Sequence, residues 1–142
     1  MKLRRMIARL RAAWQTYQSL DRRGERAAER FVRKRGMKIV GRRERDQFGE
    51  LDLIAVDGRT VVFIEVKTRR THGAGHPAEA VDADKQQRLT RLALAYLKRH
   101  DLLEFSARFD VIAVTWPESA RKPVIDYYQN AFEAVGRGQM YS

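Results

Sequence analysis

Two runs of β-forming residues, joined by an Asp-Gly pair, constrain the fold of this chain more than any other feature. The runs are Glu50–Val56 and Thr60–Thr68, and they flank Asp57-Gly58. Asp-Gly between two such runs is typical of a β-hairpin, because both residues tolerate the positive φ angles of a tight turn. The sequence therefore predicts an antiparallel hairpin here.

The rest of the chain alternates between helical and strand patterns. Asp21 can cap the start of a helix, and Gly36 stands where that helix would stop. In order, we expect a helix from Asp21 or Arg22 to Arg35, a strand at Lys38–Gly41, a polar link at 42–49 and then the hairpin. A helix at about Val81–Arg99 and strands at Arg108–Thr115 and Val124–Gln129 follow. The second helix is expected to bury Leu89, Leu92, Ala93, Tyr96 and Leu97. This order predicts an α/β sandwich around a mixed sheet.

Composition excludes several classes of protein. The length of 142 residues fits one domain with a hydrophobic core. There is no cysteine, which excludes a disulfide scaffold and a thiolate zinc site, and suits a reducing, cytoplasmic compartment. No apolar run is long enough to predict a membrane span, and no Walker-type loop predicts a nucleotide cofactor.

Positive charge is concentrated in the N-terminal quarter of the chain. The formal net charge is +11, and residues 1–35 hold twelve Lys and Arg against three acidic residues, a difference of +9. A field this basic favours a polyanionic partner, either nucleic acid or an anionic membrane. A basic protein without such a partner is the alternative.

Apolar residues near the N-terminus follow helical spacing, with arginines on the opposite face. The stripe consists of Leu3, Met6, Ile7, Leu10, Trp14 and Tyr17. We expect this helix to pack on the domain, and the alternative is a basic amphipathic helix on a membrane surface. We assign residues 1–20 to this extension and 21–142 to the domain that carries the site.

The hairpin carries three ionisable side chains that can act together. Glu65 and Lys67 are two residues apart on one strand, so both side chains leave the same face. If Asp57-Gly58 is a two-residue loop, Asp52 lies opposite Phe63 and diagonal to Glu65. A three-residue loop without a bulge would turn Asp52 to the other face.

Two carboxylates and an ammonium among apolar neighbours are costly unless something compensates them. A divalent cation supplies that compensation, and Mg²⁺ prefers one or two carboxylates with waters and phosphate oxygens. Asp52 and Glu65 match this ligand set, and Lys67 can orient an attacking water or stabilise charge in the transition state. The competing interpretation is an exposed sheet face with an ordinary salt bridge.

The hairpin segments GELDLIAVDG and VVFIEVKTR resemble the YraN-like bacterial family within the PD-(D/E)xK, or restriction-endonuclease-like, nuclease superfamily. The similarity extends over most of the chain, in Gly24–Gly36, Ala78–Leu89, Arg108–Val114 and Asn130–Phe132. Two departures stand out. Arg43 occupies the place of a usual asparagine after the first strand, and residues 1–20 are not typical.

This resemblance implies a restriction-endonuclease-like three-layer sandwich, with a central mixed β-sheet flanked by helices. It also implies an endonuclease dependent on Mg²⁺ or Mn²⁺, with Asp52 and Glu65 as metal ligands and Lys67 as the catalytic lysine. Archaeal Holliday-junction resolvases are similar, and they carry a helix glutamate eleven residues before a glycine. Glu25 stands eleven residues before Gly36, so we prefer Glu25 to Glu29 as the third acid.

Basic residues around the hairpin are candidates for contacts with nucleic-acid phosphates. Such contacts position nucleic acid without reading its sequence. Lys85 and Arg88 lie one turn apart on the predicted helix, and a solvated helix face is the competing interpretation for both. The full set consists of Arg42, Arg43, Arg69, Arg70, Lys85 and Arg88.

Together these features predict Mg²⁺-assisted hydrolysis of phosphodiester bonds in DNA, including structured or branched DNA. Asp52, Glu65 and Glu25 would serve the metal, and Lys67 the nucleophile. The alternative is a non-catalytic nucleic-acid-binding module with the same fold. By analogy with resolvases, a two-fold homodimer would suit paired cuts on two strands. The sequence leaves open whether the substrate is DNA or RNA, and whether it is a duplex, a flap or a junction.

Overall fold

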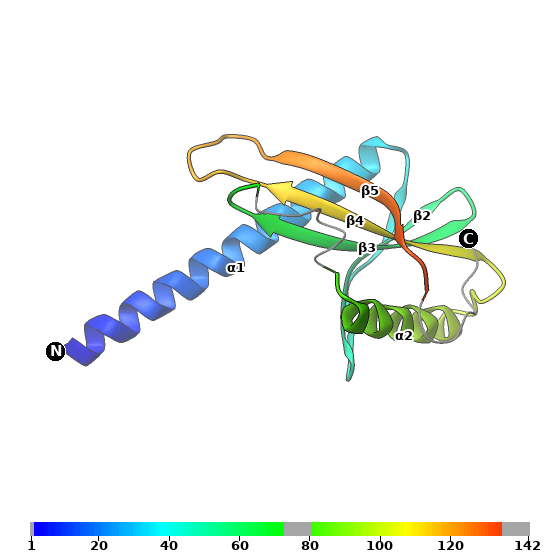
Figure 1. The fold of residues 1–142 in the computed structure, drawn as a ribbon, viewed down its shortest axis with the longest axis horizontal. Helices are drawn as coiled ribbons and strands as arrows, with labels where there is room; N and C mark the ends of the chain where they lie inside the picture. Colours follow the sequence, from blue (N-terminus) through cyan, green and yellow to red (C-terminus); the bar gives the residue numbers. More distant parts are fainter. Residues whose placement is uncertain (1, 73–80, 135–142) are drawn as a thin grey trace.

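The computed structural model describes residues 2–72 and 81–134, with only the backbone for residues 13–19. Within these ranges it contains two helices and five strands (Figure 1). In chain order they are α1 (Lys2–Lys34), β1 (Lys38–Asp46), β2 (Gly49–Asp57), β3 (Thr60–Arg69), α2 (Ala83–Arg99), β4 (Ser106–Thr115) and β5 (Val124–Phe132). The predicted order of helices and strands in the domain is confirmed.

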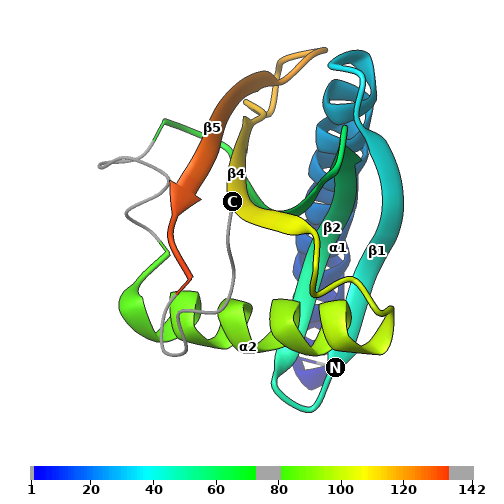
Figure 2. The ribbon, with the colours of Figure 1, turned by 90° about the vertical axis from the view of Figure 1, so that its right-hand side faces the viewer.

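The five strands form one mixed sheet in the order β1-β2-β3-β4-β5. β3 and β4 are parallel, and the other neighbours are antiparallel. α1 lies on one face of the sheet and α2 on the other (Figure 2). Because α2 connects the two parallel strands, it provides the crossover that such a pair requires. The chain is thus a three-layer α/β sandwich, which confirms the predicted fold class and is consistent with a restriction-endonuclease-like architecture.

Alternation along the strands sends side chains into two separate cores. On the α1 side, Val62 and Ile64 pack with Ala28 and Val32. On the α2 side, Phe63 packs in a core that holds the helix residues predicted to be buried, namely Leu89, Leu92, Ala93, Tyr96 and Leu97. Neighbouring residues of β3 therefore fix both helices to the sheet.

α1 is one continuous helix where two were predicted. Asp21 lies inside it and does not cap a helix start, so that prediction was wrong. The segment around Asp21 contains no proline, and nothing there stops a helix. The predicted stop at Gly36 is confirmed. Gly36 has a φ of +90°, and Met37 N–H donates to the Val32 carbonyl, as in a Schellman motif.

Gly24 lets α1 approach β3 closely. A Cβ at this position would lie 2.1 Å from Thr68 Oγ1 and 2.9 Å from Thr68 Cβ. Glycine in a helix interior costs about 1 kcal/mol relative to alanine, and this close approach explains why it is present. The contact sets the distance between Glu25 on the helix and the strand that carries Glu65 and Lys67.

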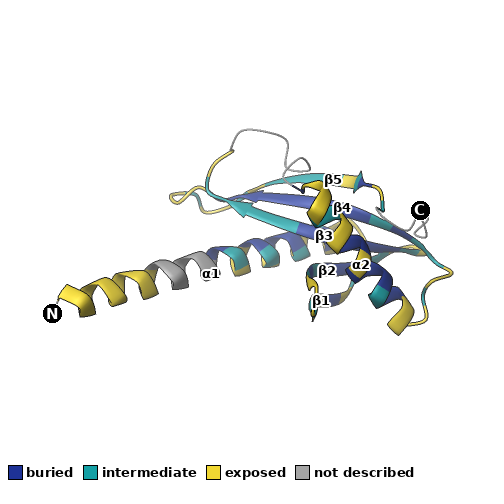
Figure 3. Ribbon diagram, turned by 60° about the horizontal axis from the view of Figure 1, so that its bottom comes forward, coloured by how far each residue is buried: buried dark blue, intermediate teal, exposed yellow. Residues whose placement is uncertain are grey.

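The N-terminal part of α1 extends beyond the sheet (Figure 3). Leu3, Met6, Ile7 and Leu10 are 63, 52, 39 and 63% exposed. For these four residues the prediction that the stripe packs on the domain was wrong, because the sheet does not reach this part of the helix. The side chains of Trp14 and Tyr17 lie outside the described residues. No helix in the described ranges is long and apolar enough to cross a membrane.

β1 is longer than the predicted Lys38–Gly41. It continues to Asp46, so most of the predicted polar link is strand. Pairing with β2 satisfies the backbone there, since Glu44 lies opposite Leu51 and Asp46 opposite Gly49. The charged residues of this segment carry no strand pattern of their own, and the neighbouring strand decides their conformation.

In the β2–β3 hairpin the side chains alternate between the two faces as predicted, but the predicted register between the strands was wrong by two residues. The loop consists of Gly58 and Arg59 instead of Asp57 and Gly58. Gly58 has a φ of +63° at the first loop position, where a type II′ turn takes glycine. The last pair of the hairpin is Leu53 with Ile64, so Asp52 and Glu65 are the next residues of their strands, and the alternation that was predicted keeps both on one face.

Candidate active site

The candidate site lies at the fork where β2 separates from β3. Pairing between these strands ends at Leu53 and Ile64, and beyond this point β2 keeps only its pairing with β1. Asp52 is the first residue of β2 past the last pair. Val66 N–H donates to Asp52 Oδ2 at 2.9 Å. The carboxylate thus takes the place of the missing strand partner.

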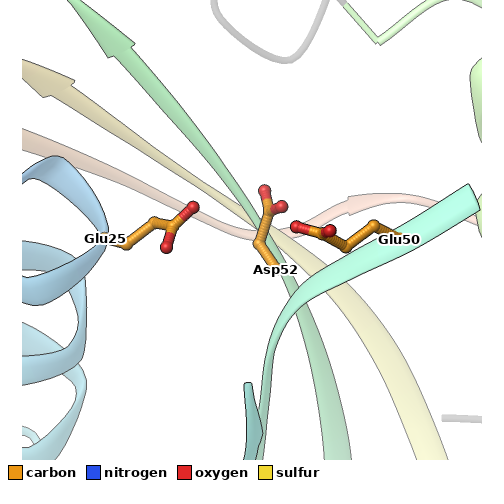
Figure 4. A group of neighbouring side chains, drawn as sticks. All are labelled: Glu25, Glu50 and Asp52. Atoms are coloured by element: carbon orange, nitrogen blue, oxygen red, sulfur yellow. The ribbon is translucent and has the colours of Figure 1, made fainter. Parts of the chain in front are cut away.

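Three carboxylates converge at this fork (Figure 4). Glu25 comes from α1, and Glu50 and Asp52 come from β2. One oxygen of each lies within 4.8 Å of one oxygen of the other two. We call Glu25, Glu50 and Asp52 the carboxylate cluster. Like charges this close repel one another, so the cluster requires positive charge from side chains or from a cation.

Arginines of β1 balance two members of the carboxylate cluster. Arg43 Nη2 lies 2.7 Å from Glu25 Oε2, and Arg45 Nη2 lies 2.6 Å from Glu50 Oε2. Arg43 has a φ of +49°, a left-handed conformation that asparagine adopts more readily than most residues. This conformation gives a physical reason for the asparagine that the YraN-like resemblance leads us to expect here.

Among the described residues, no arginine forms an ion pair or a hydrogen bond with Asp52. Burial, and then the charge of Glu65, raise the pKa of Asp52 from 3.8 to about 7. The hydrogen bond from Val66 N–H lowers this pKa but does not offset the other two effects. Asp52 is therefore the member of the carboxylate cluster that would gain most from a bound cation.

Glu65 and two lysines lie beside Asp52. Glu65 is 8% exposed, and Lys85 Nζ of α2 lies 2.6 Å from its Oε1. Burial, and then the positive charge of Lys85, lower the pKa of Lys67. Burial also lowers the pKa of Lys85, but the hydrogen bond and charge of Glu65 outweigh it and the pKa is raised. Lys67 is thus the lysine that loses its proton more readily.

A cavity of about 330 Å³ lies between α1 and β1, next to the carboxylate cluster. Its volume falls at the lower end of the roughly 300–1,000 Å³ typical of ligand pockets. Glu25 and Asp52 belong to both the cavity and the cluster, so a ligand in the cavity would reach two of the three carboxylates. The lining residues are Arg22, Glu25, Arg26, Glu29, Arg42, Arg43, Asp52 and Leu53.

Five of the six basic residues predicted to contact phosphates have partners within the chain. Arg42 pairs with Glu29, Arg43 with Glu25 and Lys85 with Glu65, while Arg69 donates to Thr115 Oγ1 and Arg70 to the Trp116 carbonyl. Arg88 is exposed on α2. Contact of these six residues with nucleic acid stays a prediction.

Glu50, Arg22 and Arg26 were not predicted from the sequence to belong to the site. A signal for Glu50 was present, because it stands two residues before Asp52 on a predicted strand, and alternation places such residues side by side. Arg22 and Arg26 gave no comparable signal. The cavity that they line exists because β1 continues beyond Gly41, which the sequence pattern did not predict.

The carboxylate cluster fits a hard divalent cation. Its three ligand atoms are carboxylate oxygens, which Mg²⁺ and Mn²⁺ prefer over nitrogen or sulfur. Two of the predicted metal-site residues, Glu25 and Asp52, belong to it. The third, Glu65, lies near enough to Asp52 for its charge to raise the pKa of Asp52, but it is bound to Lys85. Glu50 is an additional candidate ligand that the structure brings forward.

The fold and the carboxylate cluster define an α/β sandwich protein with an acidic site at the fork of a central hairpin. The chain belongs to the family described as uncharacterised protein family UPF0102, which matches residues 24–114 and confirms the YraN-like resemblance at the level of the family. The matched range contains the carboxylate cluster, Glu65, Lys67 and Lys85, while Arg22 of the cavity lies two residues before it.

Curated relatives agree with this assignment. A UPF0102 protein of Rhodopirellula baltica is 48% identical over 125 residues, which cover 86% of this chain and 75% of the relative. A UPF0102 protein of Nocardia farcinica is 50% identical over 115 residues, or 81% of this chain and 90% of the relative. A UPF0102 protein of Desulfosudis oleivorans is 44% identical over 117 residues, or 82% and 92%.

Proposed function

We propose that this UPF0102 protein is a metal-dependent nuclease of the PD-(D/E)xK superfamily, which hydrolyses phosphodiester bonds in nucleic acid, with DNA as the expected substrate. The observation that carries the proposal is the convergence of Glu25, Glu50 and Asp52 from elements remote in the chain, with oxygens within 4.8 Å. In a cluster of salt bridges with a purely structural role, each carboxylate would be paired with a positively charged side chain. Asp52 is half-buried and has no cationic partner bonded to it in the described chain.

In this proposal Asp52 and Glu25 hold Mg²⁺ or Mn²⁺, and Glu65 or Glu50 provides a further carboxylate. Such a cation, when bound, supplies a water activated for attack near neutral pH and positive charge against the phosphate. Arg43 and Arg45 hold Glu25 and Glu50 in position through ion pairs of 2.7 and 2.6 Å. β1 therefore holds Glu25 and Glu50 in position before a cation binds.

Lys67 is the residue proposed to act on the attacking water. Its pKa is lowered by burial and by the charge of Lys85, which brings it closer to the range in which a lysine can exchange protons with a water. Lys85, held by Glu65, keeps its proton and adds positive charge near the phosphate. The two lysines thus divide proton transfer and charge stabilisation between them.

A cleavage panel tests this function. Purified full-length protein is incubated with linear, flapped and four-way DNA and with RNA, each with Mg²⁺, Mn²⁺ or EDTA. We expect products from at least one DNA substrate with a divalent ion and none with EDTA. If no substrate is cut with either ion, the claim that this protein is a nuclease is contradicted.

The net charge of +11 favours a second candidate, a non-catalytic nucleic-acid-binding module. Metal titration separates the two functions. A binding module holds DNA equally well in EDTA and in Ca²⁺, and Asp52→Asn does not change this. The nuclease site should bind DNA more tightly when Ca²⁺ replaces EDTA, and Asp52→Asn should remove the gain.

A two-fold homodimer belongs to the same proposal, because paired cuts on two strands require two sites with a fixed separation. Sedimentation equilibrium of the full-length protein, alone and with four-way DNA, measures this directly. A mass of one chain per DNA would contradict the dimer and leave the nuclease proposal in place.

A further inference from the structure

Two arginines of α1 line the cavity next to the carboxylate cluster and have no carboxylate partner. Arg22 and Arg26 stand one helical turn apart, so their side chains leave the same side of α1. Neither makes an ion pair or hydrogen bond with the described part of the chain, and both are exposed to solvent. Their guanidinium groups are therefore free to bind a ligand.

Apart from Asp52, the other charged residues of the cavity lining are already paired with one another. Across from α1, Arg42 of β1 binds Glu29 and Arg43 binds Glu25. The lining holds four arginines against three acidic residues, so one positive charge is in excess. Because Glu25 and Glu29 are engaged by β1, the excess lies at Arg22 and Arg26.

We infer that Arg22 and Arg26 form a phosphate-binding subsite, which holds a backbone phosphate of the nucleic-acid strand next to the phosphate that is cleaved. Guanidinium groups bind phosphate through paired N–H donors, with a geometry that an ammonium lacks. The cavity they line reaches Asp52, so a strand that enters it would carry its neighbouring phosphodiester to the carboxylate cluster. This subsite rests on the proposed function for the identity of its ligand.

A nucleic-acid strand fits this subsite better than an anionic membrane does. A membrane that delivered a headgroup here would bring a sheet of negative charge against Glu25, Glu29 and Asp52, and like charges repel. A single strand places only a few phosphates in the cavity. The shared chemistry is a phosphate ester, and the experiment below separates the two sources.

Binding of fluorescently labelled single-stranded and duplex DNA to the full-length protein tests the subsite, in EDTA so that no cleavage occurs. Arg22→Gln and Arg26→Gln should each raise Kd at least fivefold near physiological salt. Each should also reduce the slope of log K against log salt by about 0.9 for duplex or 0.7 for single strands. Arg30→Gln is the matched control, because Arg30 is an exposed arginine of the same helix outside the cavity.

Equal losses in Arg30→Gln and the two cavity variants would overturn the subsite, since net charge alone would explain them. Flotation with phosphatidylglycerol vesicles is measured for the same variants. Unchanged DNA affinity in both cavity variants would also overturn the subsite, as would a loss of vesicle binding without a loss of DNA affinity. Arg22→Lys should keep the salt slope but lose part of the affinity, which supports the subsite even if a Gln variant unfolds. Absence of cleavage by the wild type, with these binding differences present, contradicts the nuclease and leaves the subsite intact.

Discussion

Asp52 is subject to opposing influences that set its protonation. Val66 N–H stabilises the ionised carboxylate, whereas burial and the charge of Glu65 destabilise it. The destabilising effects are larger, so ionising Asp52 at neutral pH without a cation costs the folded protein free energy. The same cost is the driving force for cation binding in our proposal.

Stability in EDTA should therefore depend on the ionisation of Asp52. The pKa of Asp52 is about 7 in the folded protein, against 3.8 for an exposed aspartate. Between about pH 4 and pH 7, Asp52 is therefore protonated in the folded state and ionised in the unfolded state. This contribution to stability is complete below about pH 4 and is lost as pH rises through 7. Asp52→Asn should thus be more stable than the wild type at pH 8, by up to a few kcal/mol, and the difference should shrink at pH 5.

Urea unfolding of both proteins at the two pH values measures this difference. Asp84→Asn is the control, because Asp84 lies in the exposed first turn of α2 and outside the carboxylate cluster. The control should change stability equally at both pH values. A stability gain of Asp52→Asn that does not vary with pH would contradict the raised pKa.

Lys67 should be required for cleavage but not for folding. Lys67→Ala removes the side chain proposed to handle the water, so we expect the cleavage rate to fall by roughly 10²-fold or more. Thermal unfolding should show a folded protein. Lys98→Ala, in the exposed last turn of α2, is the matched control and should cut at the wild-type rate. Cleavage by Lys67→Ala at that same rate would remove Lys67 from the mechanism.

At the scale of elements, the packing of α1 against β3 positions Glu25. Gly24→Ala introduces a methyl group 2.9 Å from Thr68 Cβ, so the helix and strand must separate. Overpacking of this kind typically costs about 1–3 kcal/mol, which exceeds the gain in helix propensity. We expect Gly24→Ala to lower the unfolding free energy by about 1–2 kcal/mol in urea titrations.

A double-mutant cycle identifies the cause. Thr68→Ala removes the two nearest atoms, Oγ1 and Cγ2, at 2.1 and 2.7 Å from the new methyl group. The double variant should therefore recover part of the stability lost in Gly24→Ala, because the Cβ of residue 68, at 2.9 Å, remains. Strictly additive effects would contradict a direct contact between these two positions.

The N-terminal part of α1 combines an exposed apolar stripe with arginines on its other face, as expected of a helix on a membrane surface. We predict that the full-length protein floats with phosphatidylglycerol vesicles and that Leu3→Gln with Leu10→Gln lowers the bound fraction at least tenfold. Leu103→Gln is the control, because Leu103 is 51% exposed elsewhere. Equal binding of all three proteins would leave this stripe without a membrane role.

The elements differ in how far the sequence could predict them. The hairpin, α2 and β4 carry apolar patterns of their own, and the predicted ends of these elements lie within about two residues of the observed ones. β1 beyond Gly41 is charged, and its strand conformation comes from pairing with β2. The exposed start of α1 was predicted to pack on the domain because of its amphipathic pattern. Such a pattern does not identify the surface that the apolar face contacts.

At the scale of the whole molecule, the site depends on contacts between α1 and strands that lie far from it in the sequence. Alternation predicted that Asp52, Glu65 and Lys67 share a face, and the parity of the hairpin agrees. Glu25 was placed at the site only through the resemblance to resolvases. No local pattern could show that Arg43 binds Glu25, or that Arg22 and Arg26 line a cavity with Asp52, because these contacts depend on how α1 lies against the β1–β2 hairpin.

The central claim is that the carboxylate cluster binds the cation that supports cleavage of nucleic acid. The most direct measurement is the cleavage rate of wild type, Asp52→Asn and Asp84→Asn during a Mn²⁺ titration, on the best substrate of the panel. We expect Asp84→Asn to match the wild type, and Asp52→Asn to show no cleavage at any Mn²⁺ concentration while remaining folded. Mn²⁺-dependent cleavage by Asp52→Asn at the wild-type rate would contradict the claim.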